Sequence, residues 1–200
     1  MPRLLVLLAA AFLPALAACD RNRPEDAGAS ASPTRVDSVV PRAVALERFR
    51  AGLDSLDTLA GGAPSRDALV RRFALALEGR DTAALRTMAL TRQEFAWIYY
   101  PANPQGLPPY DLGPDLMWFM LVENSRKGLA HALEERGGRQ LGFVGYSCDP
   151  RPSRERANTA WGPCVIRRVQ APGDTTAERL FGLIIERGGR FKFVSFANRL

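Results

Sequence analysis

The sequence predicts an α+β domain in which N-terminal helices pack on a four-stranded antiparallel sheet near the carboxyl terminus. Up to residue 136, apolar residues recur every three or four positions, which is the spacing of one helix face. From Gln140 onward the period changes to two, as in strands that bury one face. Hydrophobic residues make up 46% of the 200 residues and charged residues 24%. This composition excludes a wholly disordered, collagen-like or multi-pass membrane chain.

The first residues have the pattern of an export signal. Arg3 supplies a positive charge, and an uncharged, largely apolar run of 12 residues follows from position 4 to position 15. As a helix this run would be about 18 Å long, at ~1.5 Å per residue, which is too short for a stable membrane span. We therefore interpret residues 1–18 as a signal peptide.

The signal ends in Leu16-Ala17-Ala18-Cys19, which resembles the lipobox of bacterial lipoprotein precursors. In that family the signal is cut before the cysteine, and the cysteine is lipidated. The resemblance implies lipidation at Cys19 and a domain anchored in the bacterial cell envelope, facing the periplasm or the exterior. The alternative is an ordinary secretory signal with a cysteine at the cut. Asp20 resembles an inner-membrane retention signal of enteric bacteria, but the rule is not general, so the choice of membrane stays open.

The chain has three cysteines, an odd number for an exported protein. If Cys19 carries lipid, Cys148 and Cys164 remain as a pair in an oxidising compartment. We predict a disulfide between them, which would close a loop of about 15 residues. The alternative is a metal site, but these two cysteines and the single histidine, His131, are fewer than the four ligands of a structural zinc site.

Residues 19–40 are rich in polar, small and proline residues and are expected to form a flexible tether after the lipidated cysteine. An amphipathic helix is predicted over residues 41–62, from Pro41 to the glycine pair at 61 and 62. Its narrow apolar stripe consists of Leu46, Phe49, Leu53 and Leu56. This stripe either packs on the chain's own domain or forms a seam for a partner helix.

Residues 63–200 are expected to form the α+β globular domain. Its first helix is predicted between an N-cap at Ser65 and Gly79, and a shorter helix after a second N-cap at Asp81. Thr91 and Glu94 have the spacing of a capping box, which would open a helix through Tyr99. The competing prediction for segment 95–100 is a strand, because aromatic residues favour strands.

Residues 101–114 contain five prolines and two glycines, so an irregular loop is predicted there. A long helix follows over residues 115–136, with Pro114 in its first turn and a glycine pair at its end. Gly128 inside this helix costs ~1 kcal/mol relative to alanine, which a close packing contact would explain.

Four strands are predicted after this helix: from Gln140 to about residue 148, over 161–169, over about 178–186, and over 191–196. Residues 149–160 are expected to form a polar loop. The cysteines 148 and 164 fall at facing ends of the first two strands, and the glycines of Arg187-Gly188-Gly189-Arg190 predict a tight hairpin between the last two.

Helices followed by antiparallel strands are similar in order to the NTF2-like (cystatin-like) fold, over about residues 65–200. In that fold a curved sheet wraps a long helix and forms a cone. A strand pair usually precedes the third helix, and only segment 95–100 could supply part of it here. The resemblance implies a ligand cavity inside the cone, around Tyr99, Tyr100, Tyr110, Asp115 and Trp118.

Enzymes of the NTF2-like group often place an Asp, His or Tyr in the cone as acid or base. Asp115 lies in the first turn of the predicted helix, where the helix dipole alone stabilises a carboxylate. His131 lies 16 residues later, roughly 24 Å along a straight helix at ~1.5 Å per residue. The two side chains therefore cannot form an acid–base pair. The sequence has no G-x-S-x-G, glycine-rich phosphate loop or H-E-x-x-H motif. We therefore predict no catalytic, cofactor or metal residue.

The function predicted from these observations is that of a cell-envelope lipoprotein whose domain binds a small apolar ligand or an envelope protein without catalysis. The alternative is an NTF2-like hydrolase, isomerase or dehydratase with an acid or base in the cone. Besides the membrane, no nucleic-acid partner is expected, because the 27 cations, 25 of them arginine, are spread along the chain and interleaved with acids.

Overall fold

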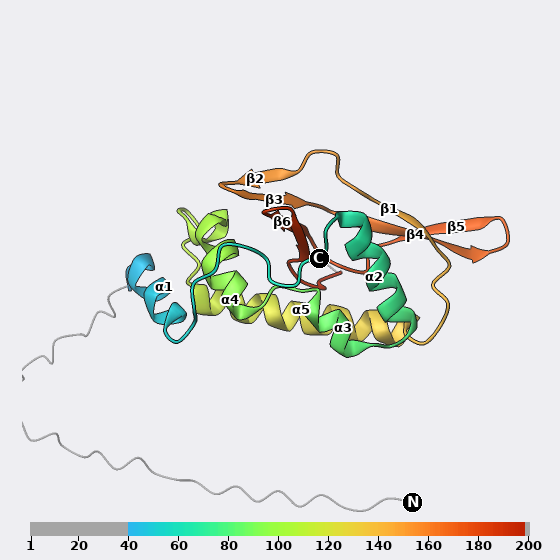
Figure 1. Cartoon of the computed structure of the whole chain (residues 1–200), viewed down its shortest axis with the longest axis horizontal. Helices are drawn as coiled ribbons and strands as arrows, with labels where there is room; N and C mark the ends of the chain where they lie inside the picture. The colour runs from blue at the N-terminus through green and yellow to red at the C-terminus, as the bar shows by residue number, and fades with distance from the viewer. Residues whose placement is uncertain (1–39, 199–200) are drawn as a thin grey trace, which may run out of the picture. The chain divides into compact units, whose positions relative to one another are not determined.

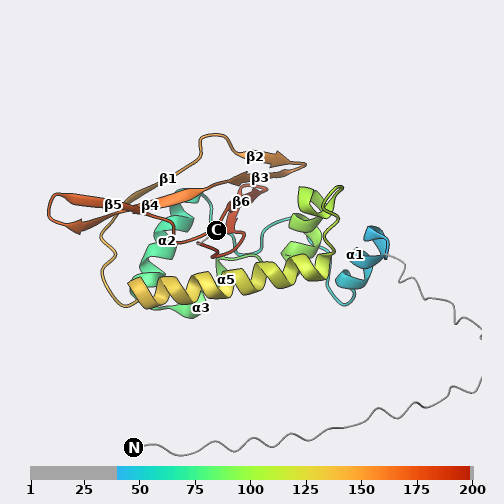
Figure 2. The ribbon, with the colours of Figure 1, turned by 180° about the vertical axis from the view of Figure 1, so that it is seen from behind.

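A computed structural model describes residues 40–198, and these form an α+β domain in which helices precede two antiparallel sheets. The predicted signal peptide 1–18, the predicted lipidation site Cys19 and the predicted tether as far as residue 39 lie outside the described residues. Figures 1 and 2 show the long helix α5 (Pro114–Arg136) running beneath the sheets, with α2 (Arg66–Glu78) packed beside them. Within residues 40–198, no helix has both the length and the apolar character that crossing a bilayer demands.

The predicted N-caps at Ser65 and Asp81 are confirmed. The Ser65 hydroxyl accepts a hydrogen bond from the Ala68 amide at 3.0 Å, and α2 follows. The Asp81 carboxylate accepts one from the Ala84 amide at 2.9 Å and opens α3 (Thr82–Thr87). Both side chains satisfy amides that have no partner inside their own helix, which sets the start of each helix.

The capping box at Thr91 is formed as predicted and decides that segment 95–100 is helical. The Thr91 hydroxyl accepts from the Glu94 amide, and the Glu94 carboxylate accepts from the Thr91 amide. The helix α4 (Arg92–Glu94) continues into a π-helical turn, η1 (Phe95–Tyr99). Two 3₁₀ turns, η2 (Tyr100–Ala102) and η3 (Pro104–Gly106), then lead through the proline-rich loop to α5.

The helix predicted over 41–62 is shorter, because α1 covers only Arg42–Arg50. It ends where Gly52 adopts a positive φ of 77°, and the chain continues without regular structure. The apolar stripe nevertheless packs on the chain's own domain: Phe49 is buried, and its ring lies 5.5 Å from that of Phe95. Leu53 and Leu56 also contact core clusters, so the spacing reflects burial rather than one continuous helix.

The single four-stranded sheet predicted from the sequence is wrong, because residues 40–198 form seven strands in two sheets. The first sheet has the order β1-β4-β5, with β1 (Phe143–Cys148), β4 (Cys164–Ala171) and β5 (Asp174–Glu178). The second has the order β2-β3-β6-β7, with β2 (Ser153–Glu155), β3 (Asn158–Trp161), β6 (Ile184–Arg187) and β7 (Arg190–Phe193). All strand pairs are antiparallel.

The break at Gly162-Pro163 divides the predicted strand 161–169 between the two sheets. Gly162 has a φ of 153°, and a Cβ there would collide with the Leu183 side chain. Pro163 has no amide hydrogen to donate to a ladder. The predicted loop 149–160 contains the β2–β3 hairpin, in which Arg156 takes a positive φ of 58°. The predicted Arg187–Arg190 hairpin is confirmed, with positive φ at both of its glycines.

The disulfide between Cys148 and Cys164 is confirmed. These residues are directly opposed in the β1–β4 pairing, and their Cα atoms are 4.0 Å apart. The bond joins the last residue of β1 to the first residue of β4. It therefore holds the register of the first sheet at the point where the β2–β3 hairpin separates the two strands along the chain.

The main core lies between α2, α5 and the sheets and is rich in phenylalanine. The Phe73 ring contacts those of Phe181, Phe193 and Phe196 at centroid distances of 5.4 to 5.8 Å. Gly128 is where α5 meets the C-terminal segment, since a Cβ at that position would collide with the Phe196 carbonyl oxygen. The glycine inside α5 is thus explained by a close backbone contact. This contact fixes the separation of α5 from residues 194–198.

Candidate functional site

A cavity of about 430 Å³ lies between the first half of α5 and the C-terminal segment of the chain. Its floor on α5 consists of Met117, Met120, Leu121 and Asn124. The spacing of these four residues places them on one face of the helix. Met117 is buried, whereas Met120 and Asn124 are exposed, so the cavity opens to solvent along this helix.

The opposite wall of the cavity consists of two short segments that pair with each other beyond β6 and β7. The Gly182 amide donates to the Ser195 carbonyl oxygen at 3.0 Å, and the Val194 amide donates to the Leu183 carbonyl oxygen at 2.8 Å. A Cβ at Gly182 would lie 3.0 Å from the Ser195 carbonyl oxygen, so this close pairing favours glycine. The remaining wall residues are Gly162, Pro163, Phe181 and Ala197.

The end of the cavity is closed by the π-helical turn and the proline-rich loop, through Tyr99, Gln105 and Leu112. The loop is held by the Tyr100 hydroxyl, which donates to the Leu112 carbonyl oxygen at 2.8 Å, and by the Leu112 amide, which donates to the Gln105 carbonyl oxygen at 2.9 Å. These contacts make the proline-rich segment an ordered part of the cavity wall. Loops of this kind often carry binding residues because a scaffold holds them.

Most of the lining is apolar, and the polar groups are few. The residues with polar side chains among the described lining are Tyr99, Gln105, Asn124, Arg179 and Ser195. Arg179 directly follows β5 and is partly buried. A mainly apolar cavity with a few polar groups, in the range of about 300–1,000 Å³, is typical of small-molecule sites.

Tyr99 is the lining residue with the most perturbed acidity. Burial, and to a lesser extent the negative charge of Glu155, raise the pKa of Tyr99 to about 12, against a smaller opposing effect of a hydrogen bond with Asn103. Burial also raises the pKa of the Glu155 carboxyl above its ordinary value. The Tyr99 phenol therefore stays protonated at neutral pH and can donate a hydrogen bond, but it cannot act there as a base.

The sequence-predicted cavity residues do not all meet at this cavity. Tyr99 lines it, whereas Tyr100 is fully buried behind it and holds the loop. Tyr110 is 66% exposed, and Asp115 is exposed in the first turn of α5; neither lines the cavity. Trp118 points to another face of α5, where its ring lies 5.2 Å from that of Phe95.

Trp118 lines a second cavity, of about 420 Å³, between α3 and α5. Its lining is also largely apolar, and it includes Arg86 and Arg126. Arg126 is paired with Glu123 at 3.0 Å, and both arginines are exposed. The second cavity therefore has no partly buried charge among the described residues that line it, unlike the first.

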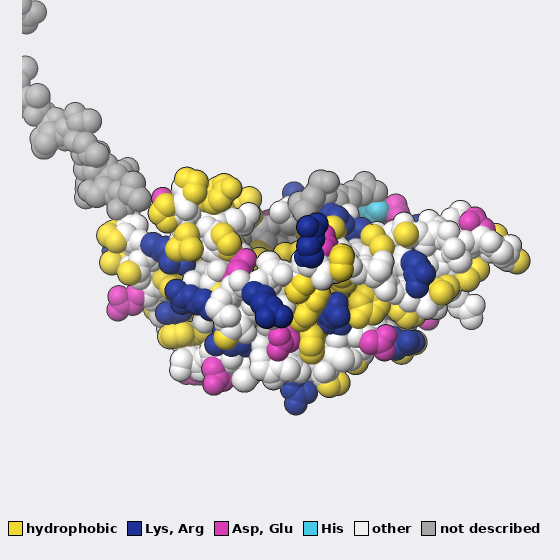
Figure 3. Space-filling model, turned by 90° about the horizontal axis from the view of Figure 1, so that it is seen from above, with side chains coloured by type: hydrophobic (Ala, Val, Ile, Leu, Met, Phe, Trp, Pro, Cys, Tyr) yellow, Lys and Arg dark blue, Asp and Glu magenta, His cyan; other side chains and the backbone are white. Residues whose placement is uncertain are grey.

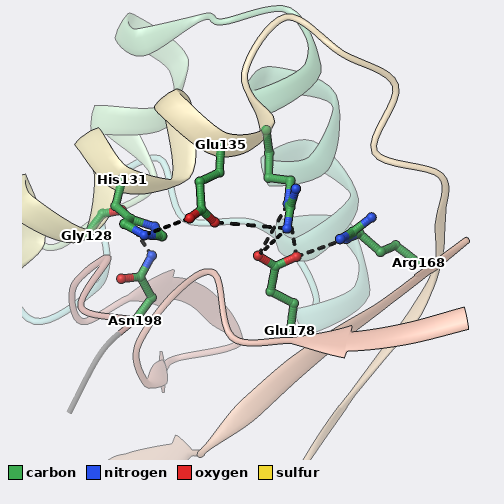
Figure 4. A network of polar contacts seen from close by, with 7 residues as sticks. Gly128, His131, Glu135, Arg168, Glu178 and Asn198 are labelled. Carbon is green, nitrogen blue, oxygen red and sulfur yellow. Dashed lines mark hydrogen bonds and ion pairs between the residues drawn. The ribbon is translucent and has the colours of Figure 1, made fainter. Parts of the chain in front are cut away.

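His131 lies far along α5 from these residues, in a network of polar contacts near the C-terminal end of the helix. Figure 4 shows His131 beside Glu135, with 3.0 Å between Nε2 and a carboxylate oxygen. Arg136, the next residue of α5, pairs with Glu178 at 3.0 Å, and Arg168 pairs with the same carboxylate at 2.9 Å. The network joins α5 to β4 and β5, and it supplies no group to either cavity.

Most of the residues that line the first cavity were not predictable from the sequence. Met117, Met120 and Leu121 have helical spacing, which could have indicated one face of α5 but not a cavity over it. Arg179 and Ser195 come to line one cavity because residues 182–183, just before β6, pair with residues 194–195, just after β7. Within residues 40–198, no three His, Cys, Asp or Glu side chains are grouped as ligands for a metal ion.

Comparisons with known proteins place the chain in no group: no family model matches it, and no curated protein and no solved structure matches it either.

Figure 3 shows one face of the domain, on which Lys and Arg side chains are spread among hydrophobic and acidic ones. Among the described residues, the best candidate for a ligand-binding site is therefore the cavity beside α5. It combines an apolar lining with a small set of polar residues.

Proposed function

We propose that this chain is a lipoprotein of the bacterial cell envelope whose domain binds a small, largely apolar molecule in the cavity beside α5. The observation that carries the binding proposal is the cavity itself, with its apolar floor on Met117 and Leu121 and its opening beside Met120. An apolar molecule that enters such a space removes its own surface and that of the lining from water, which is the main source of affinity for such ligands.

Two observations support the location. The sequence of residues 1–19 resembles a lipoprotein signal with a cysteine at the cut, and the domain contains the Cys148–Cys164 disulfide. Structural disulfides persist in oxidising compartments such as the periplasm. Several acyl chains on one residue would hold the chain at the membrane, because each buried CH₂ contributes ~0.8 kcal/mol.

For the finer fold, we propose an NTF2-like cone. Two observations support this proposal. Ala89, which precedes the long helix, forms a parallel bridge with Phe193 of β7, as a strand before that helix would in the NTF2-like fold. The long helix α5 also lies beneath the sheets (Figure 1). In such a cone the cavity beside α5 would correspond to the mouth, closed on one side by loop 101–114.

Binding without catalysis is favoured by the chemistry of the lining. Among the described residues that line the cavity, none is a histidine or a carboxylate. An enzyme is the second candidate, because Tyr99, whose phenol has a raised pKa, is among the residues that line the same cavity. Incubating the recovered ligand with wild-type protein and with Tyr99→Phe separates the two: conversion by the wild type alone would support an enzyme.

The binding proposal is tested by native mass spectrometry of the whole chain purified from its host membrane. We expect a bound small molecule in the wild type and its loss from Met117→Trp and Met120→Trp, whose larger side chains would fill the cavity. Met120 is 45% exposed, so Met120→Trp should fold even if Met117→Trp does not. Leu116→Trp is the matched control, since Leu116 is exposed on the same helix and does not line the cavity.

The binding proposal fails if the wild type carries no small molecule and crosslinks in cells to a protein through the cavity residues instead. It also fails if both tryptophan variants at the cavity retain the ligand as well as Leu116→Trp does.

The anchoring proposal is tested by labelling cells with a radioactive fatty acid. We expect the label on the wild type and on a Cys148→Ala/Cys164→Ala double variant, but not on Cys19→Ala. An intact leader or an unmodified Cys19 in the mass spectrum of protein made in its native host would contradict this assignment.

A further inference from the structure

Arg179 is the one charged side chain that lines the cavity beside α5, as far as the described residues show. It follows β5 directly and is partly buried. No residue in the range 40–198 forms an ion pair with it or accepts a hydrogen bond from it. Arg179 therefore lines a mainly apolar cavity, and none of the described carboxylates is paired with it.

The neighbouring residue, Glu178, shows how two other arginines in this part of the domain are paired with a carboxylate. Glu178, immediately before Arg179, takes hydrogen bonds from both Arg136 and Arg168, at 2.9 to 3.3 Å. Arg136 and Arg168 thus share the carboxylate of Glu178. Arg179, the next residue along the chain, lines the cavity instead. Within residues 40–198, a carboxylate pairs with Arg136 and Arg168, whereas none pairs with Arg179.

We infer that the ligand of this cavity is an anionic amphiphile, whose negatively charged head pairs with Arg179 and whose apolar body lies against Met117, Leu121 and Phe181. The inference rests on the proposed function and specifies the class of ligand. A guanidinium presents a planar fork of donors that matches a carboxylate, sulfonate or phosphate. Such a pair is stronger at a partly buried site than at the surface, because less water screens it.

Two neutral groups at the cavity complement this charge. The Ser195 hydroxyl accepts from the Ala197 amide at 3.3 Å, which leaves its own hydrogen for a ligand oxygen. The Asn124 amide lies on the opposite wall, on α5. Each is a neutral donor available to a polar atom of the ligand, and the flexible methionines can adapt to the shape of its apolar body.

The inference is tested with two fluorescent probes of nearly the same aromatic skeleton. One is 1-anilinonaphthalene-8-sulfonate, which carries a negative charge, and the other is N-phenyl-1-naphthylamine, which is neutral. Both are titrated into the whole chain, and both should bind the wild type and lose binding in Met120→Trp. Arg179→Gln should weaken binding of the sulfonate about tenfold, the scale of a lost charge-assisted hydrogen bond, and change binding of the neutral probe less than about twofold.

Two further variants make the result specific. Arg179→Lys keeps the positive charge and should restore most of the affinity for the sulfonate. Arg167→Gln removes an exposed arginine of β4 that does not line the cavity, and it should leave both probes unaffected. Near-ultraviolet circular dichroism shows whether each variant keeps its tertiary packing.

The outcomes separate this inference from the proposal on which it rests. If neither probe binds the wild type, the proposed binding function is overturned, and the inference with it. If both probes bind, and Arg179→Gln weakens them equally or not at all, the cavity binds ligands but the anionic class is wrong. The inference is likewise overturned if Arg167→Gln reduces sulfonate binding as much as Arg179→Gln does.

Discussion

The ammonium of Lys192 lies 2.8 Å from one carboxylate oxygen of Glu94 and 2.9 Å from the other, and both side chains are removed from solvent. The pair joins the last strand, β7, to α4. Glu94 also accepts from the Thr91 amide in the capping box. One carboxylate thus starts the helix that leads to the cavity and holds that helix to the sheet.

Replacing Lys192 with methionine should strongly destabilise the domain. Removing one partner of a buried ion pair leaves the other charge buried alone, which costs about 3–5 kcal/mol. We expect this loss in the free energy of unfolding measured with urea. Lys127→Met, at an exposed position of α5, is the matched control and should change stability by less than about 0.5 kcal/mol. A loss of similar size in both variants would argue against the buried pair.

The disulfide should stabilise the folded chain by restricting the unfolded one. Closing a loop of about 15 residues corresponds to ~3 kcal/mol in the chain-entropy model. Changing Cys148 and Cys164 together to alanine should lower the melting temperature under oxidising conditions, and a reductant should lower that of the wild type but not that of the variant. Two free thiols titrated in the unreduced mature protein would refute the pairing.

Gly128→Ala should destabilise the domain although alanine is the better helix former. The added Cβ would collide with the Phe196 carbonyl oxygen, and forcing atoms into a packed region typically costs about 1–3 kcal/mol. Gly145→Ala is a suitable control, because its Cβ would meet only the Arg167 side chain, at 3.5 Å. The melting temperatures of the two variants test this prediction: that of Gly128→Ala should fall further than that of Gly145→Ala. A Gly128→Ala protein more stable than the wild type would contradict the close contact with Phe196.

Glu178 should make stability fall in acid. Burial by itself raises the pKa of Glu178, but hydrogen bonds and positive charge from Arg136 and Arg168 outweigh it and hold the pKa below its ordinary value. A carboxyl group whose pKa is lowered by folding stabilises the fold above its unfolded pKa, about 4.3, and this contribution is lost as pH falls through the folded value.

Urea unfolding of the wild type and of Glu178→Gln at pH 7 and pH 3 measures this contribution. The variant should be less stable at pH 7, and its loss on acidification should be smaller than that of the wild type. The exposed Glu134→Gln on α5 serves as the control. Parallel loss of stability in the wild type and Glu178→Gln would show that Glu178 is not the group responsible.

Local features of the domain were predictable because each depends on neighbours in the chain. Ser65, Asp81 and Thr91 cap helices through amides three residues away, so a short stretch of sequence is sufficient. The hairpin at Gly188 and Gly189 depends on two residues that accept positive φ. The cysteine pairing followed from the number of cysteines and from their places at facing strand ends.

Other features required contacts that periodicity does not encode. The stripe from Leu46 to Leu56 has helical spacing, yet the helix ends at Arg50 because the chain turns at Gly52 and buries the later leucines in other clusters. The predicted strand 161–169 is divided between two sheets at Gly162-Pro163, where the backbone passes close to Leu183. A pattern of alternating residues cannot specify which partner strand each part will find.

From the sequence it was possible to predict that helices precede antiparallel strands, where three helices are capped and which two cysteines pair, because these features follow from residue types and their spacing. The tertiary structure alone decided the two sheets, the buried pair of Glu94 and Lys192, and the cavity beside α5. Arg179 and Met117 are 62 positions apart in the chain and line one cavity. Only long-range packing brings such residues together, because no local sequence pattern around Arg179 or Met117 indicates that the two will meet.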